Sequence, residues 1–208
     1  VKSYETNCLE HEMSVQKENA ELDQVIAGLP LGKKKAVEAY LKIVLNKSEY
    51  PDGLEPEVSV QFDEISRELS LDIDVVSPEL IPDVASYRFQ KSTDKIVEKK
   101  QALKITKFRY ENFCSSTVLR TIHEVLEADR GNVIRLISVK ASAPNVSSAT
   151  GKFELVALIE VATTREKFFE LNLSSVIPKD ALLHLGARVS RNMTLLQPLV
   201  AGKSVRRR

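Results

Sequence analysis

The sequence predicts an α+β fold, in which a mainly antiparallel sheet of five or six strands packs on one long helix and an N-terminal helical arm precedes them. Apolar residues alternate with polar ones over short stretches bounded by turn-forming residues, as in half-buried strands. Between about residues 102 and 130 the apolar residues recur instead at helical spacing. Residues 1–30 are charged and carry only a thin apolar stripe, which is typical of an exposed helix.

The chain divides into three parts by composition. We expect a helical arm over residues 1–30, an α+β domain over 31–200 and a basic tail over 201–208. The stretch GLPLG, residues 28–32, ends the arm, because glycine and proline both interrupt helices. A second helix is expected over about 33–46, with apolar residues along one side.

Six stretches of the domain have strand patterns. Before them, SEYPDG (48–53) forms a turn, because Pro51 disfavours helix in the residue before it and Asp-Gly favours a turn. The first two stretches predict an antiparallel hairpin with one wet face. The strands are expected at VSVQF (58–62), LSLDIDV (69–75), VASYRF (84–89), KIVEK (95–99), NVIRLISVKA (132–141) and KFELVALIEVA (152–162).

Helices follow from the remaining apolar spacing. The longest, over about 102–130, places its apolar residues on one side, ends before Gly131 and is expected to lie across the sheet. Shorter helices are expected from Thr164 and from Pro178 to about Leu185, and a polar loop is expected over 144–151.

Composition excludes several classes of protein. The chain has 208 residues, 43% of them hydrophobic, which is enough to bury a real core. Its formal charge of +1 gives no global attraction to nucleic acid or anionic lipid, so any basic patch is local. Two distant cysteines and the lack of a signal peptide or membrane-spanning stretch indicate a cytoplasmic protein without membrane association. Because the chain opens on Val1, we expect it to be part of a longer protein.

A nuclease-like pattern occurs once. Pro82-Asp83 followed by Glu98-Lys99-Lys100 matches the PD…(D/E)-x-K arrangement, in which two carboxylates hold Mg²⁺ and a lysine lies near the attacking water. The pattern needs all three side chains together at the centre of a sheet, whereas Asp83 falls in a proline-flanked linker. A metal-dependent nuclease that uses Asp83, Glu98 and Lys100 is therefore an alternative hypothesis.

Other polar residues do not form a catalytic set in the sequence. Asp72 and Asp74 lie on one face of their strand, where they form either a cation site or a solvated face. His123 has Glu127 four residues on, a spacing typical of surface pairing. The sequence shows no nucleophile paired with a base, no ligand spacing for a metal and no glycine-rich phosphate loop, so we predict no catalytic residue, metal or cofactor.

Two local lysine clusters are candidates for DNA contact. They are Lys33, Lys34 and Lys35 at the start of the second helix, and Lys99, Lys100 and Lys104 at the start of the long helix. If the fold brings the two clusters together, they could contact phosphates; otherwise they are solvated helix starts.

Several segments, in order, resemble a known family. These are SEYPDG, RELSLDIDVV (67–76), IPDVASYRF (81–89) followed by Lys91 and Asp94, VLRTIHEVLEAD (118–129), TTREKFFELNL (163–173) and HLGARVSRN (184–192) followed by Leu196-Gln197-Pro198. Between about Ala36 and Val200 the chain is similar to the region upstream of the nuclease domain in bacterial Mrr-type (type IV, modification-dependent) restriction endonuclease proteins.

The resemblance implies a non-catalytic accessory domain in defence against foreign DNA, which senses DNA, positions the nuclease or forms oligomers. Its partners would be the nuclease domain of the same or a partner chain, DNA, and a second copy. Relatives in that family generally lack an aspartate at the position of Asp83. The resemblance also suggests Thr163 as a helix cap with Glu166 three residues later, and Arg120, His123 and Arg165 as interface candidates. Direct DNA binding through the lysine clusters is the further alternative.

Overall fold

The computed structural model describes residues 2–147 and 149–199. Its helices are α1 (Lys2–Gly28), α2 (Lys34–Leu45), α3 (Leu103–Ala128), α4 (Arg165–Phe169) and α5 (Pro178–His184), with single 3-10 turns η1 (Pro78–Leu80) and η2 (Met193–Leu195). Its strands are β1 (Glu57–Asp63), β2 (Glu68–Asp74), β3 (Val84–Gln90), β4 (Lys95–Lys100), β5 (Leu136–Val146), β6 (Phe153–Thr164) and β7 (Arg188–Val189). The predicted α+β fold, with its long helix and helical arm, is confirmed.

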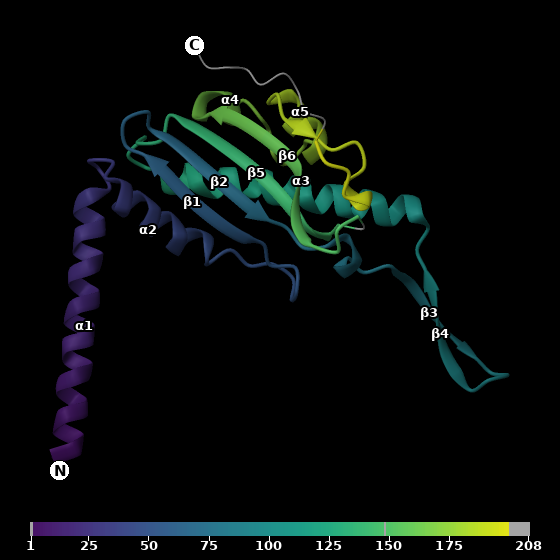
Figure 1. Ribbon diagram of the computed structural model, residues 1–208, viewed down its shortest axis with the longest axis horizontal. Coiled ribbons are helices and arrows are strands. Elements are labelled where there is room, and N and C mark those ends of the chain that lie inside the picture. Colours follow the sequence, from purple (N-terminus) through teal and green to yellow (C-terminus); the bar gives the residue numbers. More distant parts are fainter. Residues whose placement is uncertain (1, 148, 200–208) are drawn as a thin grey trace.

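Five strands form the main sheet, in the order β1-β2-β5-β6-β7 (Figure 1). Three of the four pairings are antiparallel, including the predicted β1–β2 hairpin. The pairing of β2 with β5 is parallel, because the chain returns to the same end of the sheet along α3. Strand β5 continues to Val146, so the loop expected over 144–151 is shorter than its composition suggested.

One face of the sheet is covered and the other is open. Helix α3 lies behind the sheet in Figure 1, and α2 and α5 contribute to the same core. Alternate strand residues point into this core, as the period of two requires. Its largest fully buried side chains are Tyr110, Phe62, Phe168, Leu41, Leu69, Leu71, Ile73, Ile122, Leu126, Ile137, Leu158 and Ile159.

Strands β3 and β4 do not join this sheet. Among the described residues they pair only with each other, and they form a two-stranded ribbon that extends away from the domain (Figure 1). The main sheet therefore has five strands, the lower of the two predicted numbers, and β3 and β4 are not among them. Alternation identifies a strand but not its partner, and here β5 takes the position beside β2. The fifth strand of the sheet is β7, whose two residues have no sequence pattern.

The predicted arm is the helix α1, which also extends away from the domain (Figure 1). It contacts the rest of the protein where it meets α2, across a turn in which Lys33 donates its backbone N–H to the carbonyl oxygen of Gly28. The tail predicted over 201–208 lies outside the described residues. Within the part of the chain that the structure describes, no helix is both long and apolar enough to cross a bilayer.

Candidate nucleic-acid interface

The β3–β4 ribbon is the most exposed part of the domain. Every residue from Ala85 to Lys100 is exposed, and the strands meet around a turn in which Asp94 has a positive φ of 50°. The register pairs Tyr87 with Glu98 and Phe89 with Ile96. Since directly paired residues share a face of a ribbon, the two faces can be assigned from this register.

The two faces of the ribbon differ in chemistry. One face carries Tyr87, Phe89 and Ile96, together with Glu98. The other face carries the pairs Arg88 with Val97, Gln90 with Lys95, and Ser86 with Lys99. The ribbon is therefore amphipathic although neither face is covered.

Positive charge is concentrated in the ribbon and in the first turns of α3. Residues 84–109 contain eight Lys and Arg against two Asp and Glu, a net charge of +6 in a chain whose total is +1. The predicted contacts Lys99, Lys100 and Lys104 belong to this set. Sequence reasoning missed its other members, Arg88, Lys91, Lys95, Lys107 and Arg109, although the alternation of Arg88 with Tyr87 and Phe89 was a usable signal. The local field here favours an anionic ligand.

The base of the ribbon is held by one charged contact and by the backbone. Lys100 Nζ donates to Asp83 Oδ2 at 2.8 Å, and the N–H of Gln101 donates to the carbonyl oxygen of Asp83 at 2.7 Å. The hydrogen bond from Lys100 lowers the pKa of Asp83, and the same bond raises the pKa of Lys100. Arg109 also donates to the carbonyl oxygen of Pro82, at 3.2 Å, which ties α3 to this base.

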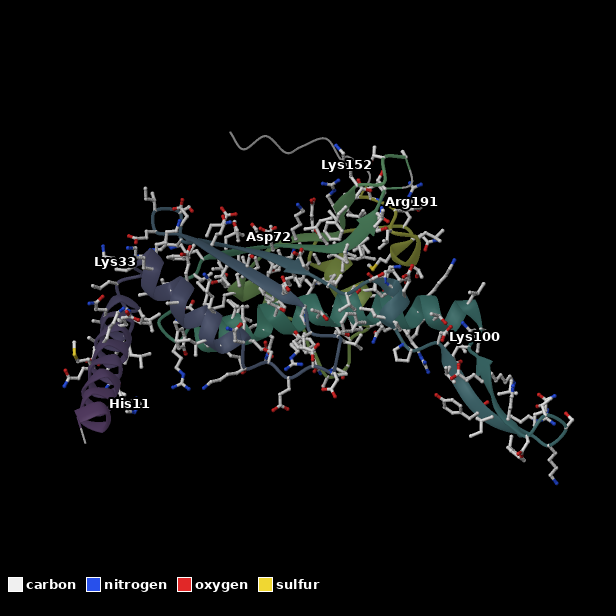
Figure 2. The ribbon with its side chains drawn as sticks, turned by 60° about the horizontal axis from the view of Figure 1, so that its bottom comes forward. His11, Lys33, Asp72, Lys100, Lys152 and Arg191 are labelled. Carbon is white, nitrogen blue, oxygen red and sulfur yellow. The ribbon has the colours of Figure 1, made fainter. Side chains whose placement is uncertain are left out.

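The two lysine clusters are not brought together. Lys33 and Lys100 lie at opposite ends of the protein (Figure 2), so the condition for one joint phosphate site is not met. The first cluster is also paired with acids: Lys33 Nζ lies 3.8 Å from Glu64 Oε2, and Lys34 Nζ lies 3.9 Å from Glu38 Oε1. Because α2 begins at the sheet end remote from the ribbon, Lys33, Lys34 and Lys35 form a separate surface.

The nuclease-like residues lie at the exposed base of the ribbon rather than at the centre of a sheet. Asp83 and Lys100 are in contact, and Glu98 lies two residues before Lys100 on β4, in the exposed ribbon. Asp72 and Asp74 lie on the open face of the main sheet, where burial, followed by the charges of Glu57 and Asp72, raises the pKa of Asp74. Among residues 2–147 and 149–199, no group of three or more His, Cys, Asp or Glu side chains converges as ligands would.

Arg120, one interface candidate, holds the SEYPDG turn on α3. Its Nε donates to Glu124 Oε1 and its Nη1 to the carbonyl oxygen of Glu49, each at 2.7 Å. Its guanidinium lies 4.7 Å from the ring centroid of Tyr50, and Ser48 Oγ donates to Glu124 Oε2. The turn is thus structural, and Arg120 connects it to the longest helix.

Arg165 and His123, the other interface candidates, also have contacts within the domain. Arg165 Nη2 donates to Asp129, to its carbonyl oxygen at 2.8 Å and to its Oδ2 at 2.9 Å. His123 Nε2 lies 3.6 Å from Glu127 Oε1, and the His123 ring lies 6.4 Å from that of Phe168. Both side chains keep some exposure, so their role at an interface stays a prediction.

The cap of α4 is Thr164, not Thr163. Thr164 Oγ1 accepts from the N–H of Lys167 at 3.4 Å, whereas Thr163 is buried in β6. The Glu166 carboxylate accepts hydrogen bonds from the backbone N–H of Glu166 and from the side chain of Thr164, and these bonds lower the pKa of Glu166. The strand continues one residue further than the capping pattern suggested, which moves the cap by one position.

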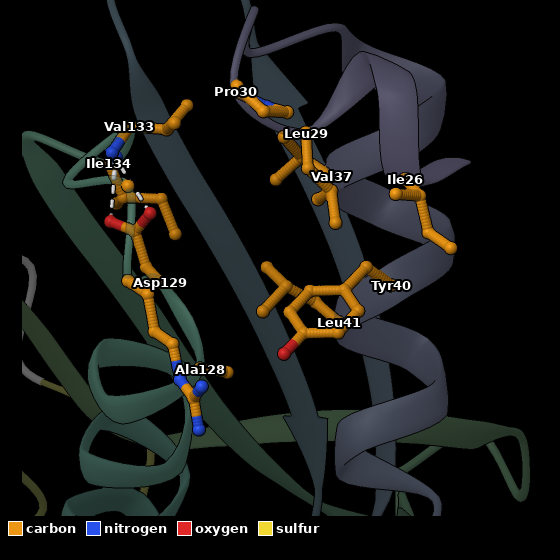
Figure 3. Close-up of a pocket in the computed structure, with 12 residues that line it drawn as sticks. Ile26, Leu29, Pro30, Val37, Tyr40, Leu41, Ala128, Asp129, Val133 and Ile134 are labelled. Carbon is orange, nitrogen blue, oxygen red and sulfur yellow. Dashed lines mark hydrogen bonds between the residues drawn. The ribbon is translucent and has the colours of Figure 1, made fainter. Parts of the chain in front are cut away.

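A pocket of about 300 Å³ lies between the α1–α2 turn and the end of α3 (Figure 3). Its walls are mostly apolar, with Tyr40, Asp129 and Arg130 as polar members. The Asp129 carboxylate already accepts from the N–H groups of Val133 at 2.9 Å and Ile134 at 3.0 Å, as the dashed lines in Figure 3 show. The carboxylate therefore closes the end of α3 rather than facing a ligand.

The fold and the surface together define an α+β domain with a protruding, strongly basic two-stranded ribbon. Comparison of the chain with protein-family models, curated proteins and solved structures gave no match. The resemblance to the Mrr-type region stays a prediction.

Proposed function

We propose that this chain is a non-catalytic accessory domain of an Mrr-type restriction endonuclease in defence against foreign DNA, and that it acts by contacting DNA. The observation that supports DNA contact is the net charge of +6 over residues 84–109, which comprise the ribbon, exposed on both faces, and the first turns of α3. Two-stranded ribbons fit the grooves and backbone of nucleic acids, and Lys and Arg supply most of the binding free energy through phosphate contacts.

The position of the ribbon supports a role in holding DNA for a neighbouring domain. The ribbon extends beyond the sheet, so a long polyanion can contact it without meeting the rest of the domain (Figure 1). The open face of the sheet lies apart from the ribbon and carries Ser70, Asp72, Ser138 and Lys140 along a shallow groove of about 470 Å³. This face leaves room for the nuclease domain of the same or a partner chain.

The test of DNA contact is binding of fluorescein-labelled DNA, both duplex and single-stranded, measured by anisotropy across a salt series. We expect affinity to fall steeply with salt, because bound phosphates release counterions. The triple variant Arg88→Gln, Lys95→Gln, Lys99→Gln should weaken binding and reduce the slope of log K against log salt by about 2–3.

The matched control removes the same charge from the other end of the protein. Lys33→Gln, Lys34→Gln, Lys35→Gln should change affinity by a much smaller factor, since this cluster is remote from the ribbon and partly paired with Glu64 and Glu38. Equal losses in the two triple variants, or no binding to either form of DNA, would contradict the proposed function.

A further inference from the structure

The ribbon carries two uncovered aromatic rings beside its cations. The exposed fractions are 67% for Tyr87 and 55% for Phe89, and Ile96, which is paired with Phe89, is 70% exposed. An uncovered apolar face is unfavourable in water. A two-stranded ribbon also has little stability of its own to offset this cost. The face is therefore available to a ligand that offers apolar surface.

Cations lie close to this aromatic face, most of them on the opposite face of the ribbon. Arg88 lies between the two rings in the chain, Lys91 follows them, and Lys95 and Lys99 lie on the paired strand. Neighbouring strands are only about 4.8 Å apart, so the long Lys and Arg side chains of the basic face reach the edges of the ribbon. A ligand that stacks on the rings thus has cations within reach of its backbone.

We infer that the ribbon binds single-stranded DNA in preference to duplex, with unpaired bases stacked on Tyr87 and Phe89 and phosphates along the ribbon edges. This inference rests on the proposed DNA contact. A duplex presents phosphates and base edges but keeps its base faces stacked on each other, so it leaves both rings in water. A single strand presents base faces and phosphates together, which matches both faces of the ribbon.

Glu98 limits this site at one end. It is paired with Tyr87 and shares the aromatic face, where a carboxylate repels phosphate. The ring of Phe89, paired with the apolar Ile96, has no acid opposite it and is therefore the better stacking position. Glu98→Gln should accordingly strengthen single-strand binding, with the larger effect at low salt.

The experiment uses the full chain with a 20-nucleotide single strand of mixed sequence and the matching 20-base-pair duplex, each labelled with fluorescein. We expect the single strand to bind about tenfold or more tightly than the duplex at equal salt. The variant Tyr87→Ala, Phe89→Ala should abolish this preference, while Tyr87→Phe and Phe89→Tyr should keep it. Phe153→Ala is the matched control, because Phe153 is 70% exposed and belongs to β6 of the main sheet rather than to the ribbon, and should leave the preference unchanged.

The outcomes separate this inference from the proposed function. Equal or tighter binding of the duplex overturns the single-strand preference and leaves DNA contact standing. Single-strand affinity that survives removal of both rings overturns the stacking. If neither form of DNA binds, the proposed function and the inference both fail. Because the ribbon lies outside the core, the variants should fold, and circular dichroism checks that they do.

Discussion

Lys100 Nζ lies 2.8 Å from Asp83 Oδ2, across the base of the β3–β4 ribbon. Two residues of the nuclease-like pattern are therefore in contact with each other, as an exposed ion pair. In the arrangement that the pattern describes, the aspartate faces a shared cation together with the glutamate. Here the carboxylate faces an ammonium group, and the contact connects the strand that enters the ribbon with the strand that leaves it.

Asp83→Asn should loosen the ribbon without unfolding the domain. Because Lys100 lowers the folded pKa of Asp83, the contribution of the pair is present above the ordinary value of 3.8 and is lost as pH falls through the lowered value. At neutral pH, amide hydrogen exchange in β3 and β4 should therefore be faster in the variant, with the global unfolding midpoint unchanged. Asp94→Asn, in the ribbon turn, is the control. A lower global midpoint in Asp83→Asn would show that the ribbon supports the core.

Asp129→Ala should destabilise the whole domain. The buried carboxylate accepts from the N–H groups of Val133 and Ile134 and from Arg165, so its removal leaves two N–H donors and a largely buried guanidinium without this partner. We expect a loss of about 3 kcal/mol in the free energy of unfolding, measured by urea denaturation. Asp52→Ala, in an exposed turn, should change it by less than about 0.5 kcal/mol. A similar loss in both variants would refute the structural role of Asp129.

Asp74→Asn should stabilise the protein at neutral pH. Burial and the charges of Glu57 and Asp72 raise the folded pKa of Asp74 above its ordinary value of 3.8. Ionised Asp74 is therefore less favourable in the folded than in the unfolded chain, and stability falls as pH rises from 3.8 through the raised value. The wild-type free energy of unfolding should show this fall, and the variant should lack it. An unchanged pH profile in the variant would show that Asp74 is well solvated.

Cys114 should react with thiol reagents only when the protein unfolds. Burial raises the pKa of its thiol to about 12, and the thiolate, which is the reactive form, is then scarce at neutral pH. In a Cys8→Ser background, alkylation by iodoacetamide should follow the urea unfolding curve measured by circular dichroism. Rapid alkylation of the native protein would mean that α3 opens locally around this residue.

Much of the fold follows from local patterns in the sequence. The alternation in 58–62 and 69–75 predicted the β1–β2 hairpin, and the helical spacing after residue 102 predicted α3. The arm was predicted as an exposed helix because its residues are mostly charged and its apolar stripe is thin. Each of these features depends on neighbours within a few residues, so periodicity is enough to find it.

The candidate interface was only partly predictable. Lys99, Lys100 and Lys104 stood out as a cluster, whereas Arg88 and Lys95 belong to the same surface only because the register of β3 and β4 places them there. The apolar residues of the two strands suggested burial in the main sheet, and their exposure is set by which strand β2 pairs with.

The sequence by itself determined the kinds of element in this protein and their order, because helix and strand periodicity, turns and caps are local properties of the chain. Only the tertiary structure decided that β2 and β5 pair in parallel, that β3 and β4 stand apart as a ribbon, and that Lys33 and Lys100 lie at opposite ends. These outcomes depend on which strands compete for the same sheet edge and on where α3 carries the chain. That competition is settled by packing between residues far apart in sequence, which no local pattern records.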